Sequence, residues 1–159
     1  MTQPDKIFEL QRLFISVAEK ELPESSETSW NEYSILTYFW PSPCARMQGL
    51  WANVNEHEIM LATALSHTHI DKAHPDIRSV QTDDVPVRIV QQTVAEVLEI
   101  FSGETVFTKN YTPDGLEHSS SSMSPRWLWK DPHHRSKWTE YHGEGWSTRA
   151  WDWRGAIVD

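Results

Sequence analysis

Two histidines, His67 and His69, have the spacing in this chain that best suits chemistry. If they lie on a β-strand, residues two positions apart point to the same face, so both imidazoles can reach one metal ion. A metal site needs a third ligand, and the chemically suitable residues elsewhere are His57, Asp71, His74 and His118. The spacing selects none of these. A metal-dependent enzyme that uses His67 and His69 is therefore one hypothesis, and the other is a pair of histidines that hydrogen-bond to neighbours or solvent.

Other catalytic patterns are absent from the sequence. The single cysteine, Cys44, has no base near it in the sequence, so a small packed residue is the simpler interpretation. The chain contains no GxSxG, HExxH or glycine-rich phosphate-binding motif. The neighbouring acids Asp83 and Asp84 stand where a helix is predicted to begin, and the helix dipole explains them. We therefore favour a role other than catalysis and expect no cofactor.

The charge of the chain limits its partners. The 159 residues include 23 acids and 14 bases, which gives a net charge of −9 with neutral histidines. Residues 105–159 carry equal numbers of acids and bases, so the excess of acid lies in residues 1–104. Nucleic-acid binding requires the opposite sign to neutralise phosphates, and we expect none. The excess suits a basic protein partner, or it serves solubility.

Length and composition predict the broad class of the protein. A chain of this length folds as one domain, 1–159. One cysteine and no zinc-binding cluster fit a reducing cytoplasm. The N-terminal residues MTQPDKIFELQ lack a basic region followed by an apolar core, so we expect no signal peptide and a mature protein equal to the whole chain. No run of about 18 apolar residues is present, so we expect no membrane contact.

Two amphipathic helices are predicted, over about 4–22 and 83–102. In the first, apolar residues recur at helical spacing, Thr2 is the expected capping residue and Pro23 ends the helix. In the second, an apolar stripe runs along the helix and Gly103 supplies a left-handed stop. Five valines lower the helix propensity of the second segment, so packing on a sheet must stabilise it.

Extended segments lie between the helices. Residues 31–40, 46–54 and 58–70 are rich in β-branched and aromatic residues or alternate in polarity, and their short connections predict an antiparallel meander. The segment 58–70 has the longest alternation, and both of its faces are largely apolar or small. We therefore expect it to be an inner strand of the sheet.

Further strands are predicted after the second helix. Residues 105–111 and 116–123 flank the hairpin turn ThrProAspGly. The last third of the chain then holds six of the nine tryptophans. Trp127 and Trp129 are two positions apart, as are Trp151 and Trp153, so each pair faces one side if its segment is extended. Core packing and an exposed aromatic surface for a partner are both open interpretations.

These elements predict an α+β fold. We expect an antiparallel sheet of about five to six strands with the two helices packed on it, in the order α-β-β-β-α-β-β-β. A sheet covered by helices also offers a pocket, for which Trp40, Trp51 and Phe101 are the expected lining. A small-ligand-binding α+β domain is therefore a further hypothesis.

The layout of the whole chain carries one resemblance. Its features are the order helix, meander, helix and hairpin, the acidic and aromatic-rich composition, and the closing segment YHGEGW (141–146) that runs into WDW (151–153). In these features the chain resembles the immunity proteins of bacterial polymorphic-toxin and contact-dependent inhibition systems. The neutral C-terminal third departs from a uniformly acidic inhibitor.

The resemblance implies a cytoplasmic protein that neutralises a cognate toxin, a basic nuclease-like domain, by occluding its active site or an adjacent surface. Acidic side chains would give fast association and aromatic side chains slow release. The partner-binding residues that we expect on this basis lie in the loop before the second helix, at its start, and in the C-terminal loop: Asp71, Asp76, Asp83, Asp84, Trp138 and Tyr141.

Overall fold

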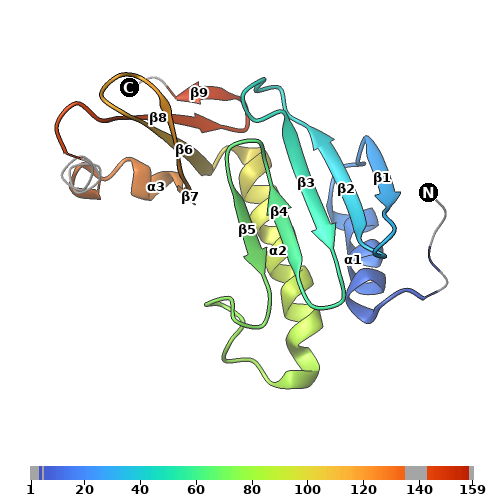
Figure 1. The fold of residues 1–159 in the computed structure, drawn as a ribbon. Helices are drawn as coiled ribbons and strands as arrows, with labels where there is room; N and C mark the ends of the chain where they lie inside the picture. The colour runs from blue at the N-terminus through green and yellow to red at the C-terminus, as the bar shows by residue number, and fades with distance from the viewer. Residues whose placement is uncertain (1–3, 5, 135–142, 158–159) are drawn as a thin grey trace. The chain divides into compact units, whose positions relative to one another are not determined.

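The computed structural model describes residues 4, 6–134 and 143–157 (Figure 1). Over these residues the chain forms helices and nine strands, which pair into two antiparallel sheets of the orders β1-β2-β3-β4-β5 and β7-β6-β8-β9. The predicted α+β class is therefore confirmed. The prediction of five or six strands in one sheet differs in detail, because the strands divide between two sheets. No described helix is long and apolar enough to cross a membrane.

The chain divides into two compact units. The first unit comprises Met1–Pro41, Gly49–Thr63 and His67–Leu98, and the second comprises Ser42–Gln48, Ala64–Ser66 and Glu99–Asp159. By sequence, the first unit has 14 acids and 6 bases, whereas the second has 9 acids and 8 bases. Nearly all of the net negative charge therefore belongs to the first unit. The single domain expected from chain length stays a prediction.

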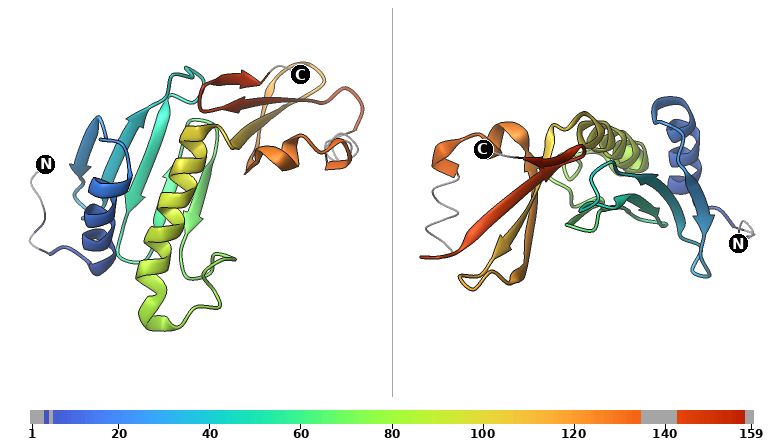
Figure 2. Two further views of the ribbon diagram at one scale, coloured as in Figure 1. Left: turned by 180° about the vertical axis from the view of Figure 1, so that it is seen from behind. Right: turned by 90° about the horizontal axis from the view of Figure 1, so that it is seen from above.

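The first unit contains the five-stranded meander and the helices that cover it. In chain order its elements are α1 Glu9–Glu21, β1 Glu27–Trp30, β2 Leu36–Pro41, β3 Gly49–Val54, β4 Ile59–Ala62, β5 His67–Ile70, the short 3-10 helix η1 Thr82–Asp84, and α2 Val85–Ser102, which continues into the second unit. Figure 2 shows α1 and the part of α2 up to Leu98 on the same face of this sheet. The strand residues on that face are almost fully buried: Leu36, Leu50, Ala52, Val54, Ile59, Leu61 and Ile70.

Both predicted helices are present, with one changed boundary. The first begins at Glu9 rather than at residue 4, with Phe8 as its N-cap residue, and the expected capping residue Thr2 lies outside the described residues. The second is confirmed over its predicted length, because η1 and α2 together run from Thr82 to Ser102. Gly103 follows with φ of +80°, the left-handed conformation that ends a helix.

The segment 58–70 is not the single inner strand that its alternation predicts. It forms the hairpin β4–β5, and β5 lies at the edge of its sheet. The chain reverses at 63–66, where the Leu65 side chain is buried and the Ala64 N–H donates to the Met47 carbonyl at 3.1 Å. Tertiary contacts of this loop thus override the local alternation. The reversal pairs His67 with Ala62 and so places both histidines on the face opposite Ile59 and Leu61.

The second unit holds the four-stranded sheet. Its elements are β6 Thr105–Tyr111, β7 Glu117–Pro125, α3 Arg126–Trp129, β8 Ser147–Asp152 and β9 Gly155–Ile157. The predicted ThrProAspGly turn is confirmed: Gly115 has φ of +82° and its N–H donates to the Thr112 carbonyl at 2.8 Å. Trp127 and Trp129 do not lie on an extended segment. Their segment is the short helix α3, which starts where the Arg126 N–H donates to the Glu104 carbonyl at 2.7 Å.

The tryptophans that the structure describes differ in burial. Trp151 and Trp153 are buried in the second unit, whereas the Trp127 side chain is 71% exposed. In the first unit, Trp40 pairs with Leu50 on the covered face of the sheet, and Trp51 packs on Phe39 on the other face. Trp40 and Trp51 therefore do not line a common pocket, and the predicted ligand site at these residues is wrong.

Candidate binding groove

A groove of about 1160 Å³ lies within the first unit. Its floor is apolar, and three of the residues that line it are almost fully buried: Leu10 from α1, Ile77 from the loop before η1, and Ile89 from α2. Phe8, Val80, Val85 and Pro86 extend this apolar lining. We call this feature the binding groove. Four separate segments build it: the start of α1, the β1–β2 turn, the β3–β4 turn, and the loop from β5 into α2.

Two asparagines shape the turns that border the groove. The Asn31 side-chain oxygen accepts hydrogen bonds from the N–H groups of Tyr33 and Ile35, both at 2.9 Å. The Asn55 side-chain oxygen accepts from the N–H groups of His57 and Glu58 at 2.7 and 2.9 Å. Such side-chain to backbone bonds stabilise tight turns without a partner strand. They hold the side chains of both turns at the edge of the groove.

Gln11 joins these turns to α1. Its side chain is fully buried, and its amide nitrogen donates to the Ser34 carbonyl at 2.7 Å and the Val54 carbonyl at 3.0 Å. Its side-chain oxygen accepts from the Phe8 N–H at 3.0 Å, which satisfies one of the free donors at the helix start. A single polar side chain in the core thus connects three of the segments beside the groove.

The loop from β5 into α2 is held by its own polar contacts. The Asp71 carboxylate accepts from the Ala73 N–H at 2.7 Å, and the Asp71 carbonyl accepts from the His74 N–H at 3.1 Å. The His74 imidazole lies 3.3 Å from the Glu96 carboxylate of α2. These contacts bring Ile77, which is 1% exposed, into the floor of the groove.

The rim of the groove is charged, with acid in excess. The acidic residues on it are Glu9, Glu56, Glu58 and Asp71, and the basic residues are Lys72 and Arg78. Tyr33 also lines the groove, and its side chain is 77% exposed. The combination of an apolar floor with charged and aromatic side chains at the edge is the usual composition of a protein-binding surface.

The structure brings one of the predicted partner-binding residues to the groove. Asp71 lines it, whereas Asp76, Asp83 and Asp84 are exposed nearby in the chain but do not line it. The other two predicted residues, Trp138 and Tyr141, lie outside the described residues. Sequence reasoning missed Tyr33 and Glu56. Each of these residues follows an asparagine, Asn31 or Asn55, that begins a tight turn. An asparagine of this kind predicts the turn but not the surface that the turn borders.

The two candidate metal ligands lie side by side on β5. The ring centroids of His67 and His69 are 5.3 Å apart, and both residues are exposed. The His69 Nδ1 lies 2.9 Å from the carboxylate of Glu58, the residue directly before β4, and the two side chains form a hydrogen-bonded pair. Among the described residues, no three His, Cys, Asp or Glu side chains form a group that could hold a metal ion. Of the possible third ligands, His57 and His74 are each close to an acid, Glu56 and Glu96 respectively.

The chain was also compared with known proteins. No protein-family model, no curated protein and no solved structure matches it.

Proposed function

We propose that this protein binds a protein partner through the binding groove, and that it acts as an immunity-type protein that neutralises a cognate toxin. In this proposal the immunity-type protein covers the active site of the toxin or an adjacent surface. The observation that supports it is the groove itself, which combines a buried apolar floor with an acidic rim in the unit that holds nearly all of the net negative charge.

The chemistry of the groove describes the segment that it would accept. Apolar side chains of the partner would fill the floor beside Leu10, Ile77 and Ile89. Lysine or arginine side chains on either side of them would meet Glu9, Glu56 and Glu58 on the rim. Burial of apolar surface would supply most of the affinity, and the rim charges would raise the rate of association.

The size of the groove favours a polypeptide over a small molecule. Pockets for small ligands enclose roughly 300–1000 Å³ and bury most of the ligand. This groove is larger, and four segments with charged side chains border it. A polypeptide segment can contact all four borders at once.

The partner is sought among secreted toxins encoded beside the gene of this protein. The toxin domain is purified, and its activity is measured with increasing amounts of the full chain. Inhibition at a one-to-one ratio, with a complex that is stable in size-exclusion chromatography, is the expected result. A toxin domain that keeps full activity and forms no complex would overturn the proposal.

Two substitutions place the binding surface. Glu56→Lys reverses a rim charge, and we expect slower association and a weaker dependence of the association rate on salt. Tyr33→Ala removes an exposed aromatic side chain at the groove, and we expect at least about tenfold faster dissociation if it contacts the toxin. Glu27→Lys, at an exposed position of β1 outside the groove, is the matched control. Equal effects of Glu56→Lys and Glu27→Lys would exclude the groove as the contact surface.

Two of the four acids expected from the sequence are tested in the same assay. Asp83→Lys and Asp84→Lys reverse charges that do not line the groove, so we expect a smaller effect than that of Glu56→Lys. A larger effect would move the contact surface to the start of α2.

A further inference from the structure

Two cations stand directly opposite each other in the sheet of the second unit. Lys109 of β6 pairs with Arg149 of β8, and the two side chains therefore lie on the same face. Like charges at directly opposed positions of a sheet destabilise it unless a counter-charge lies nearby. The Lys109 side chain is only 12% exposed, so solvent screens its charge poorly.

A third cation, Arg46, belongs to the same cluster. Its loop is tied to the second unit, because the Ser42 hydroxyl donates to the Trp153 carbonyl at 2.8 Å. The Arg46 guanidinium lies 5.9 Å from the centroid of the Trp151 ring, and the Arg149 guanidinium lies 4.5 Å from that of Tyr111. Both rings are largely buried. These cation–π contacts hold the two guanidinium groups over the sheet before any ligand binds.

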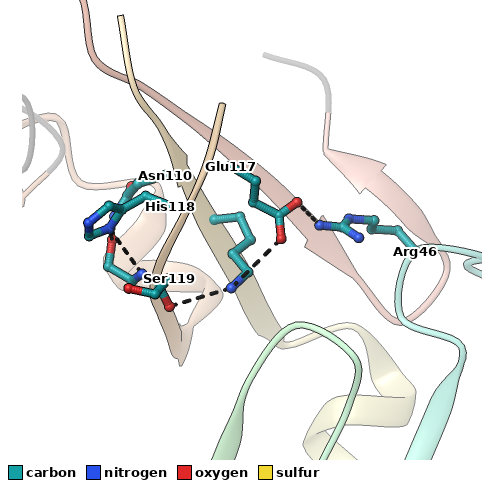
Figure 3. Close-up of polar contacts among 7 residues, drawn as sticks. Arg46, Asn110, Glu117, His118 and Ser119 are labelled. Atoms are coloured by element: carbon teal, nitrogen blue, oxygen red, sulfur yellow. Dashed lines mark hydrogen bonds and ion pairs between the residues drawn. The ribbon is translucent and has the colours of Figure 1, made fainter. Parts of the chain in front are cut away.

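One acid, Glu117, contacts two of these three cations. Glu117 forms an ion pair with Arg46 (Figure 3), and its Oε1 lies 3.9 Å from the Lys109 Nζ. The Lys109 ammonium also donates to the Ser119 carbonyl at 3.5 Å. Both contacts of Lys109 are long for a charged donor. In the part of the chain that the structure describes, no carboxylate forms an ion pair with Arg149.

From this arrangement we propose that Arg46, Lys109 and Arg149 bind a phosphate group. Among the residues that the structure describes, three cations and one carboxylate leave a local charge of +2, which a phosphate dianion neutralises and a single carboxylate does not. Arginine and lysine donors match the oxygens of phosphate, and the Arg46 guanidinium keeps N–H groups free beyond the one that contacts Glu117. The ligand is either inorganic phosphate or the phosphate of a small phosphorylated molecule.

The test is isothermal titration calorimetry of the full chain at about pH 7.5, where both ligands are mainly dianions. Sodium phosphate and a nucleoside monophosphate are titrated separately, with ionic strength held constant by sodium chloride. We expect saturable binding at one site. Tighter binding of the nucleoside monophosphate assigns the site to a phosphorylated small molecule, and equal or weaker binding assigns it to inorganic phosphate. The absence of saturable binding for both ligands would overturn the proposal.

Variants tie the binding to the cluster. Arg149→Gln, at an exposed position, should weaken binding about tenfold or more, because one charge-assisted hydrogen bond is lost. Glu117→Gln should tighten binding, because it removes the competing acid. Lys130→Gln changes an exposed cation that is not in the cluster and should leave the affinity unchanged. An unchanged affinity in Arg149→Gln, or an equal loss in Lys130→Gln, would show that phosphate does not bind here.

A folding control accompanies these titrations. Arg149→Gln removes one member of a like-charge pair, so its melting temperature without phosphate should equal or exceed that of the wild type. Lys109→Gln removes the more buried cation of the Lys109–Arg149 pair, so its result is interpreted only in comparison with that of Arg149→Gln. Phosphate should raise the melting temperature of the wild type, and it should raise that of Arg149→Gln less.

Discussion

Replacement of Gln11 by methionine tests whether one buried side chain holds the binding groove together. Methionine has nearly the same size and a similar helix propensity, so the substitution removes the hydrogen bonds of Gln11 and little else. The side chain is fully buried, and it donates to the carbonyls of Ser34 and Val54 and accepts from the N–H of Phe8.

The expected loss follows from these three bonds. A hydrogen bond between neutral groups contributes about 1 kcal/mol, and a buried group left without a partner costs about 1–3 kcal/mol. Water can reach Phe8 and Ser34, which are partly exposed, whereas Val54 is fully buried. We therefore expect Gln11→Met to lower the free energy of unfolding by about 3 kcal/mol, with the largest share from the Val54 carbonyl.

Urea unfolding at equilibrium, followed by circular dichroism and by tryptophan fluorescence, measures this loss. The control is Gln91→Met, the same chemical change at an exposed position of α2, for which we expect a change within about 0.5 kcal/mol. A loss below about 1 kcal/mol in Gln11→Met would refute the reasoning, because the three bonds would then contribute less than one ordinary hydrogen bond. At urea concentrations where the variant is still folded, weaker binding of the proposed protein partner would show that Gln11 also keeps the groove in shape.

Two further predictions concern the first unit. Burial, and after it the charge of Glu19, raises the pKa of Tyr38 above its ordinary value of about 10. As the pH rises past 10, Tyr38 therefore ionises first in the unfolded chain, and the free energy of unfolding falls. Tyr38→Phe should lose less stability than the wild type between about pH 8 and pH 11. An equal loss for both proteins in urea unfolding would contradict this. Gly49→Ala should destabilise the protein by about 2 kcal/mol, because a Cβ would lie 2.1 Å from the Phe39 ring and 2.7 Å from a backbone carbonyl. Gly155→Ala, where a Cβ meets no atom within 4 Å, is the control for urea unfolding, and equal losses in the two variants would contradict the steric explanation.

Some elements of the fold follow from local signals in the sequence. The helix α2 has its apolar stripe, acids in η1 directly before it and Gly103 at its end, and all of these act within a few residues of the helix. The ThrProAspGly turn is equally local, since Gly115 alone supplies the positive φ that the hairpin needs. Elements of this kind can be predicted because neighbouring residues stabilise them.

Tertiary contacts decided the rest of the fold. The alternation over 58–70 suits one long strand as well as two short ones, and tertiary contacts such as the burial of Leu65 and the bond from Ala64 to Met47 divide it. Trp127 and Trp129 have strand spacing, yet their segment is helical. Where a sequence pattern is compatible with two secondary structures, the residues that pack against the segment determine which one forms.

The candidate site shows the same division between local and distant causes. By itself the sequence determined that the net negative charge lies in the first two thirds of the chain, and that Asp71 stands in the loop before the second helix. Only the tertiary structure decided that Asp71 borders a groove with Glu56 and Tyr33, and that Asp83 and Asp84 do not. Charge and turn propensity are properties of single residues and their neighbours, whereas a groove forms from segments that meet only after the core residues beneath them have packed.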